Sequence, residues 1–163
     1  MVDQGLQGWG RHLAGGRTPG DEYVEQMQQV CIAASGHPIV IHADISFDEL
    51  AKRYAQSAIY WRASGYGEDE VEGPNEFAYL GITTAEAMAS GCVPIVSGKG
   101  GQPEIVTPGA NGYLWQNPAE LKILMLRLIE DLSLREKISA AAPSDSRLVK
   151  PTSAPDWISS CSK

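Results

Sequence analysis

The sequence predicts an α/β domain whose parallel sheet is doubly wound and covered by helices on both faces. Two observations predict it. Short, continuous apolar runs indicate strands that are buried on both faces, and amphipathic segments separate these runs. The length of 163 residues and the 43% share of apolar residues suit one globular domain with a single core.

Charge and cysteine content exclude several classes of function. The 20 acidic residues outnumber the 13 basic ones, and the net charge of −7 argues against general binding to nucleic acid or to an anionic membrane. No apolar run approaches the roughly 20 residues of a membrane span. Three cysteines without metal-binding spacing indicate reduced thiols, so we expect a cytoplasmic protein with no metal site.

The chain begins with a strand and a helix. Residues 13–16 end a short strand in a glycine turn. Thr18 and Pro19 then suit the N-cap and the first position of a helix, which Gly36 ends. Apolar side chains at helical spacing give this helix one apolar face: Tyr23, Met27, Val30, Cys31 and Ala34.

Two further strands enclose a second helix. The β-branched run 38–41 and the apolar run 58–61 are predicted strands. Between them, Ser46 and Glu49 form a capping box, which indicates a helix that continues to Tyr54.

The pattern continues in the second half of the chain. A helix is predicted at residues 83–90, strands at 93–96 and 113–115, a helix that starts at Asn117, and a short helix at 134–142. The buried stripe of the helix that follows Asn117 is predicted to hold Leu121, Leu124, Met125, Leu128 and Leu132. From residue 143 the chain is mostly polar with few apolar anchors. We therefore divide it into a domain at residues 1–142 and a low-order tail at 143–163.

The start of the 83–90 helix is the most informative segment for chemistry. Gly81 precedes this helix, and Thr83 and Thr84 lie in its first turn, where backbone N–H groups lack partners and the helix dipole is positive. A phosphate fits there, and Glu86 is placed one turn later to accept hydrogen bonds from ribose hydroxyls. An ordinary helix start that binds nothing has the same spacing, so the residues alone leave both interpretations open.

A second glycine-rich segment follows the 93–96 strand. In open α/β sheets, ligands bind outside the carboxyl ends of the strands. Lys99, beside Gly100 and Gly101, would meet an anion there, and a flexible turn with a solvated lysine is the alternative.

The remaining polar residues form no recognisable catalytic set. His12, His37 and His42 share no metal-like spacing and are interpreted as surface or packing residues, and the acidic run 68–70 as a solvated loop. The sequence has no Ser-His-Asp arrangement and no CxxC pair, which argues against hydrolase and redox functions. It also lacks a G-x-G-x-x-G motif after an opening strand, which argues against a plain dinucleotide-binding domain.

Four stretches, taken in order, resemble the C-terminal half of retaining GT-B glycosyltransferases of family four. They are WRASGYGEDE at 61–70, GITTAEAMASGCVP at 81–94, GGQPEIV at 100–106 and NGYLW at 111–115. The resemblance implies a Rossmann-like domain that binds a nucleotide-sugar donor. It implies transfer of a hexosyl group to an acceptor hydroxyl with retention, and no cofactor besides that donor substrate.

The resemblance also implies roles by position. The turn formed by Gly81, Ile82, Thr83 and Thr84 would hold the diphosphate through backbone N–H groups, and Glu86 matches the second Glu of the family's E-x7-E motif and would bind the ribose. The segment from Gly100 to Glu104 would lie near the donor sugar, and Lys99, Gly100 and Gly101 are the donor-binding candidates of this loop. Asp44 and Ile45 would lie along the base.

The first glutamate of the E-x7-E motif is absent. Ala78 stands in its place, and Glu76 is two positions away. In the family this glutamate contacts the donor sugar or its leaving diphosphate. The loss of one charged hydrogen bond costs about 1.5–3 kcal/mol, or about 10–100-fold. The resemblance therefore implies a domain that is inactive or weak alone.

Two larger parts of the family pattern have no counterpart here. One is the acceptor-binding N-terminal domain, and the other is the first strand of the donor domain with its basic residues, which would precede Gly8. That strand is central in a doubly wound sheet, and its loss leaves unpaired backbone groups. We expect self-association or a separate acceptor-domain protein as partner. The alternative is a truncated interaction or structural module that keeps the fold without binding a donor.

Overall fold

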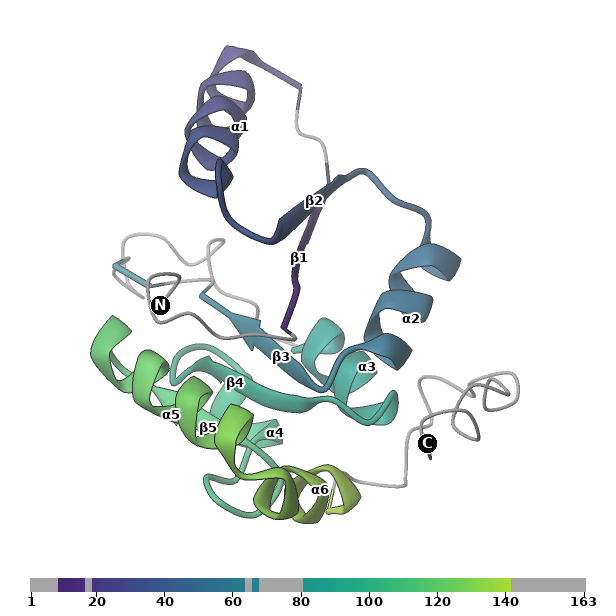
Figure 1. Ribbon diagram of the computed structural model, residues 1–163, viewed down its shortest axis with the longest axis vertical. Helices are drawn as coiled ribbons and strands as arrows, with labels where there is room; N and C mark the ends of the chain where they lie inside the picture. The colour runs from purple at the N-terminus through teal and green to yellow at the C-terminus, as the bar shows by residue number, and fades with distance from the viewer. Residues whose placement is uncertain (1–8, 17–18, 64–65, 68–80, 142–163) are drawn as a thin grey trace. The chain divides into compact units, whose positions relative to one another are not determined.

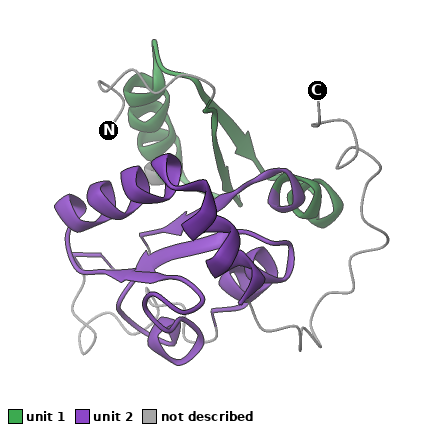
Figure 2. Ribbon diagram, turned by 60° about the horizontal axis from the view of Figure 1, so that its bottom comes forward, with its two compact units in different colours: residues 1–53 green, residues 54–163 purple. Residues whose placement is uncertain are grey.

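The chain alternates strands and helices, and all of its described strand pairs are parallel. A computed structural model describes residues 9–16, 19–63, 66–67 and 81–141 and divides into two compact units, residues 1–53 and 54–163 (Figure 1, Figure 2). The strand orders are β1-β2 in the first unit and β3-β4-β5 in the second. The predicted α/β class with parallel strands is confirmed, and within the described residues the strands form two sheets instead of one.

The smaller unit is a β-α-β-α arrangement. Its elements are β1 (Arg11–Gly15), α1 (Asp21–Ala34), β2 (Ile39–Ala43) and α2 (Phe47–Gln56), the last of which crosses the boundary between the units. The strands pair from Arg11 opposite Ile39 to Gly15 opposite Ala43. None of the described residues of this unit is buried.

The start of α1 differs from the prediction. Gly20 is the N-cap with φ 135°, no side chain caps the helix, and Pro19 lies before it. Thr18 lies outside the described residues. The end is as predicted, because Ser35 is the C-cap and Gly36 after it takes a left-handed φ of 77°.

The apolar face of α1 is only partly covered, and the cap of α2 is as predicted. Tyr23, Met27 and Ala34 are half-buried, whereas Val30 and Cys31 are exposed. Ser46 Oγ accepts the Glu49 N–H at 3.3 Å, so the start of α2 is confirmed.

The larger unit holds the core of the described structure. Its elements are β3 (Ile59–Arg62), α3 (Ile82–Ala89), β4 (Val93–Ser97), α4 (Gln102–Ile105), β5 (Tyr113–Trp115), α5 (Pro118–Glu130) and α6 (Leu132–Ala140). The central strand β4 pairs with β3 from Ile59 opposite Val93, and with β5 from Ile95 opposite Tyr113. In Figure 1, α5 and α6 lie on the near face of this sheet and α3 and α4 on the far face.

Every residue of β4 is buried, because helices and strands surround it. Buried side chains from α3, α5 and α6 join it, among them Met88, Leu128 and Ile138. Gly112 precedes β5 where a Cβ would stand 2.8 Å from Pro94 O and 2.9 Å from Val106 Cγ1, so only glycine fits at this crossing.

Three of the five residues predicted for the buried stripe of α5 are buried, and Leu124 is half-buried. Asn117 caps the helix by accepting the Glu120 N–H at 3.0 Å. Leu121, Met125 and Leu128 are buried. Leu132 is 54% exposed, contrary to prediction, because α5 stops at Glu130 and a new helix begins.

Asp131 separates the last two helices. Its Oδ1 accepts the Leu134 N–H at 2.8 Å and caps α6, so this helix begins at Leu132 and not at 134. The tail predicted from residue 143 onward lies outside the described residues.

Cys92 and Cys31 are expected to differ sharply in reactivity. The buried Cys92 Sγ lies 3.2 Å from the carbonyl oxygens of Tyr54 and Ser57, and burial raises the pKa of its thiol from 9.0 to about 12. In a Cys31→Ser, Cys161→Ser variant, the remaining thiol should react with an aromatic disulfide reagent at least about 100-fold more slowly than the single thiol of Cys92→Ala, Cys161→Ser.

The same pKa shift predicts alkaline destabilisation. Between pH 9 and 12 the unfolded thiol ionises while the folded thiol keeps its proton, so the unfolded state binds fewer protons and the free energy of unfolding falls as pH rises. Denaturant titrations of the wild type and Cys92→Ala should diverge in this window. Rapid modification of Cys92 in the native protein would contradict the described packing.

Candidate functional site

The helix α3 begins at a tight glycine turn. Gly81 has φ 53° and ψ 25°, the left-handed region, and its carbonyl oxygen accepts the N–H groups of Thr84 and Ala85 at 3.0 Å each. A Cβ on Gly81 would collide with Ile105 Cδ1. The left-handed conformation favours glycine at this position, and any Cβ there would also displace the end of the Ile105 side chain.

The first backbone N–H groups of α3 lack acceptors in the described part of the chain. No hydrogen bond links the N–H of Ile82 or Thr83 to another described residue. Ile82 is 49% exposed and Thr83 is half-buried. Such groups, with the positive end of the helix dipole, favour an anion.

Two side chains of β3 contact the first turn of α3. The Tyr60 hydroxyl lies 3.0 Å from Thr83 Oγ1, and Arg62 Nη1 donates to the same oxygen. Neither Tyr60 nor Arg62 was among the predicted site residues. The apolar run was interpreted as ending at Trp61, whereas β3 includes Arg62 and places it at the carboxyl end of the strand.

On its other side, the turn contacts the second glycine-rich segment. Thr84 Oγ1 donates to Gln102 Oε1 at 2.8 Å, and these residues are 0% and 3% exposed. Gln102 Nε2 is buried and lacks a hydrogen-bond partner among the described residues. It lies 3.5 Å from the position that a Cβ of Gly81 would take. Gln102 lies within the segment Gly100 to Glu104 that the resemblance places near the donor sugar, but it was not singled out as a site residue.

Lys99, Gly100 and Gly101 lie between β4 and α4. Lys99 and Gly100 are half-buried, Gly101 is buried, and Gly100 has φ 60°. The Lys99 carbonyl oxygen accepts the Gln102 N–H at 3.4 Å. Together with the Thr84–Gln102 bond, these contacts place the two glycine-rich segments of the sequence side by side.

Glu86 lies one turn into α3 and is half-buried. Burial raises the pKa of its carboxyl. Burial also raises the pKa of Tyr54, with further contributions from Tyr60, Glu86 and Cys92, while Arg62 opposes the rise. Glu86 therefore shares its surroundings with the aromatic residues Tyr54 and Tyr60, whose rings meet edge to face at 5.8 Å.

Asp44 and Ile45 belong to the smaller unit. Asp44 has φ 59°, the only positive φ among the described non-glycine residues, and its N–H donates to Gly15 O at 2.8 Å. A left-handed aspartate carries a conformational cost and is often found at ligand sites. Ala78, the position of the lost glutamate, lies outside the described residues.

The parallel pairing of β1 with β2 brings two histidines together. His12 Nδ1 lies 2.8 Å from His42 Nε2, and the rings stack with centroids 5.1 Å apart. Burial lowers the pKa of His12, and the charges of His42 and Arg53 lower it further. Sequence spacing did not reveal this pair, because thirty residues separate its members. In the described ranges, His, Cys, Asp and Glu do not gather in groups of three or more able to hold a metal.

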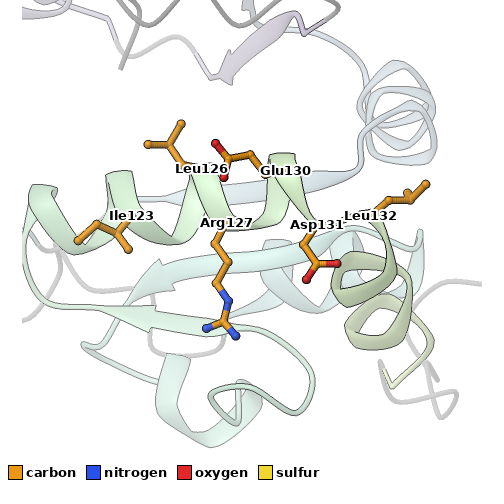
Figure 3. Close-up of a pocket in the computed structure, with 6 residues that line it drawn as sticks. All are labelled: Ile123, Leu126, Arg127, Glu130, Asp131 and Leu132. Carbon is orange, nitrogen blue, oxygen red and sulfur yellow. The ribbon is translucent and has the colours of Figure 1, made fainter.

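A surface cavity of about 660 Å³ lies along α5 and contains none of the predicted site residues. Its lining is Ile123, Leu126, Arg127, Glu130, Asp131 and Leu132 (Figure 3). Apolar side chains mix there with both charges, and Ile123 is 64% exposed. As for membranes, the described helices include none with the length and apolar character needed to cross one.

Known proteins resemble the chain over most of its length. Residues 32–145 match the family model "Glycosyl transferases group 1". The sulfoquinovosyl transferase SQD2 of Arabidopsis thaliana is 29% identical over 135 residues, which are 79% of this chain and 23% of that protein. The chain thus spans less than a quarter of this relative.

Two solved structures share the fold. One is the C-terminal domain of a glycosyl transferase group 1 family protein (LpcC) from Francisella tularensis, with a TM-score of 0.60, 29% identity, and coverage of 80% of this chain and 64% of the other. The other is sucrose-phosphate synthase from Thermosynechococcus elongatus, with a TM-score of 0.62, 25% identity, and coverage of 80% and 31%. The family match, the parallel α/β fold and these neighbours lead to one conclusion: the chain belongs to the glycosyl transferases group 1 family and has the Rossmann-like fold of a GT-B C-terminal domain.

Proposed function

We propose that this domain binds the nucleotide-sugar donor of a retaining hexosyltransferase. The diphosphate lies against the N–H groups of Ile82 and Thr83, and Glu86 accepts hydrogen bonds from the ribose hydroxyls. The observation that carries the proposal is the Gly81 turn, where first-turn N–H groups of α3 lack acceptors in the described residues and the buried Gln102 Nε2 lacks one as well. A diphosphate offers acceptors to all of these donors.

The proposal extends to the loops that surround the turn. The segment with Lys99, Gly100 and Gly101 borders the donor sugar, and Asp44 and Ile45 border the base. The reaction is transfer of a hexosyl group to an acceptor hydroxyl with retention, and it needs an acceptor site outside this domain. Because Ala78 replaces a glutamate of the family motif, the domain alone is weak or inactive.

A partner for the open strand edge is part of the proposal. The Val93 N–H donates to Ala58 O, so the backbone groups of Ala58 point towards β4. Successive residues of a strand point their N–H and C=O groups to opposite sides, and those of Ile59 and Trp61 therefore point away from β4. No described strand pairs with that edge of β3. Unpaired strand edges favour pairing with another chain. We propose a second copy or a separate acceptor-domain protein as partner. An interaction module without donor binding is the competing function that this edge favours.

Donor binding is tested by calorimetry with UDP-, GDP- and ADP-sugars at millimolar concentration. The wild type should bind at least one of them. Gly81→Ala should weaken binding, because a side chain at the left-handed φ strains the turn and its Cβ displaces the end of the Ile105 side chain. Gly109→Ala is the matched control, since Gly109 also has a positive φ of 76° but no atom within 4 Å of a Cβ. Absence of binding by the wild type to every donor would overturn the proposal.

Restoring the family glutamate should strengthen donor binding. Ala78→Glu is expected to lower the dissociation constant by about 10–100-fold, the value of one charged hydrogen bond. Ala78→Gln has the same length without the charge and should give a clearly smaller gain. Equal affinities of the two variants and the wild type would contradict a role for position 78 at the donor.

Self-association is tested by light scattering over a wide concentration range. We expect a mass above that of the monomer which decreases on dilution. Trp61→Lys places a charge on the exposed edge residue of β3, and should shift the equilibrium towards monomer. Lys122→Ala on α5 serves as the surface control. A monomer at all concentrations would exclude a second copy as the partner.

A further inference from the structure

Arg62 brings a positive charge to the start of α3. It is the last residue of β3, and its Nη1 donates to the side-chain oxygen of Thr83. Thr83 is also the residue whose backbone N–H lacks an acceptor among the described residues. Only Cβ and Cα separate the hydroxyl oxygen of Thr83 from its backbone nitrogen. The Arg62 guanidinium, which contacts that oxygen, therefore lies close to the backbone N–H of Thr83.

A second, independent donor lies at the same turn. Gln102 is 3% exposed, its Oε1 is held by Thr84, and its Nε2 has no partner within the described residues. This Nε2 is 3.5 Å from the Cβ position of Gly81. A buried amide donor without an acceptor is costly, and an anionic ligand at the turn removes that cost.

The contact between Arg62 and Thr83 can be exchanged without leaving the hydroxyl unsatisfied. The Tyr60 hydroxyl lies 3.0 Å from the same Thr83 oxygen and keeps it hydrogen-bonded. The guanidinium of Arg62 carries further N–H donors besides the Nη1 that contacts Thr83. Its planar set of N–H donors matches two phosphate oxygens at once, which a single ammonium group does not.

We propose that Arg62 is the cationic residue that binds the diphosphate of the donor. This inference rests on the proposed donor site and assigns it a charged side chain. In the unliganded protein the guanidinium rests on Thr83. When the diphosphate binds between the α3 amides and Gln102, Arg62 donates to it, and Tyr60 retains Thr83.

The competing role for Arg62 is purely structural: its hydrogen bond would only hold Thr83 against β3, and we call this role a brace. The two roles differ in their dependence on charge. A brace is lost equally when either member of the Arg62–Thr83 contact is removed. A ligand contact is lost mainly when the guanidinium is removed, and it contributes to the salt dependence of anion binding.

The test is calorimetric titration of the full chain with inorganic pyrophosphate and with UDP at low and high salt. Arg62→Gln should weaken binding of both by about 10–100-fold and reduce the salt dependence. Thr83→Val should weaken binding by less than about threefold with the salt dependence of the wild type, because valine keeps the backbone N–H. Arg127→Gln, on the exposed side of α5, should bind as the wild type does.

Arg62→Lys keeps the charge and loses the fork geometry. It should lie between the wild type and Arg62→Gln in affinity, with the salt dependence of the wild type. Circular dichroism establishes that each variant is folded. If Arg62→Gln fails to fold, the comparison of Arg62→Lys with Thr83→Val decides, and a loss confined to the lysine variant supports the inference.

The outcomes separate this inference from the donor proposal. If the wild type binds neither pyrophosphate nor any nucleotide or nucleotide-sugar, the donor site itself fails and the inference with it. If the wild type binds and Arg62→Gln binds equally well, only the inference is overturned. Equal losses in Arg62→Gln and Thr83→Val, with no recovery in Arg62→Lys, establish the brace and overturn it too.

Discussion

The larger unit depends on the complete burial of β4. All five residues of this strand are buried, β3 pairs with residues 93–96 and β5 with residues 95–97, and helices cover both faces. Burial of apolar surface contributes about 25 cal/mol per Å², so this strand and the helices on it supply most of the stability that the described residues offer. The candidate site lies just beyond it. The Lys99 loop leaves the carboxyl end of β4, and α3, which packs on β4, presents its first turn beside that loop.

The two units differ in how they are stabilised. The larger one has a buried core, whereas the described residues of the smaller one include no buried side chain. The smaller unit exposes Val24, Ile32 and Phe47, and it has no buried apolar residue among its described ones to balance them. A two-stranded parallel sheet is rarely sufficient on its own, because parallel sheets need both faces covered. The stability of the smaller unit is therefore expected to depend on burial of apolar side chains beyond that seen among its described residues.

The sequence predicted those features that depend on local chemistry. Apolar runs located the strands, and the caps at Ser46 and Asn117 are present as expected. It failed where neighbouring elements decide. Leu132 continues the helical spacing of α5, but the Asp131 cap starts a new helix and exposes it. His12 and His42 meet only because two distant strands pair in one register.

The candidate site shows the same division. The Gly81 turn was predictable, since a glycine before a polar helix start has a local meaning. Tyr60 and Arg62 were not, and Gln102 was marked only as part of the segment Gly100 to Glu104, because their individual contacts cross β3, α3 and α4. The roles of the predicted residues towards a donor stay predictions.

Pro94 limits how the last strand can be placed. By the alternation along β4, its missing N–H is the one that would point towards β5, and β5 begins one pair later, where Ile95 faces Tyr113. Opposite Pro94, Gly112 at the start of the β5 segment has no room for a side chain. A shift of β5 along β4 would therefore bring a residue with a Cβ against Pro94. The length of the 107–111 connection is accordingly set by steric exclusion, and an insertion there must bulge outward and leave the register unchanged.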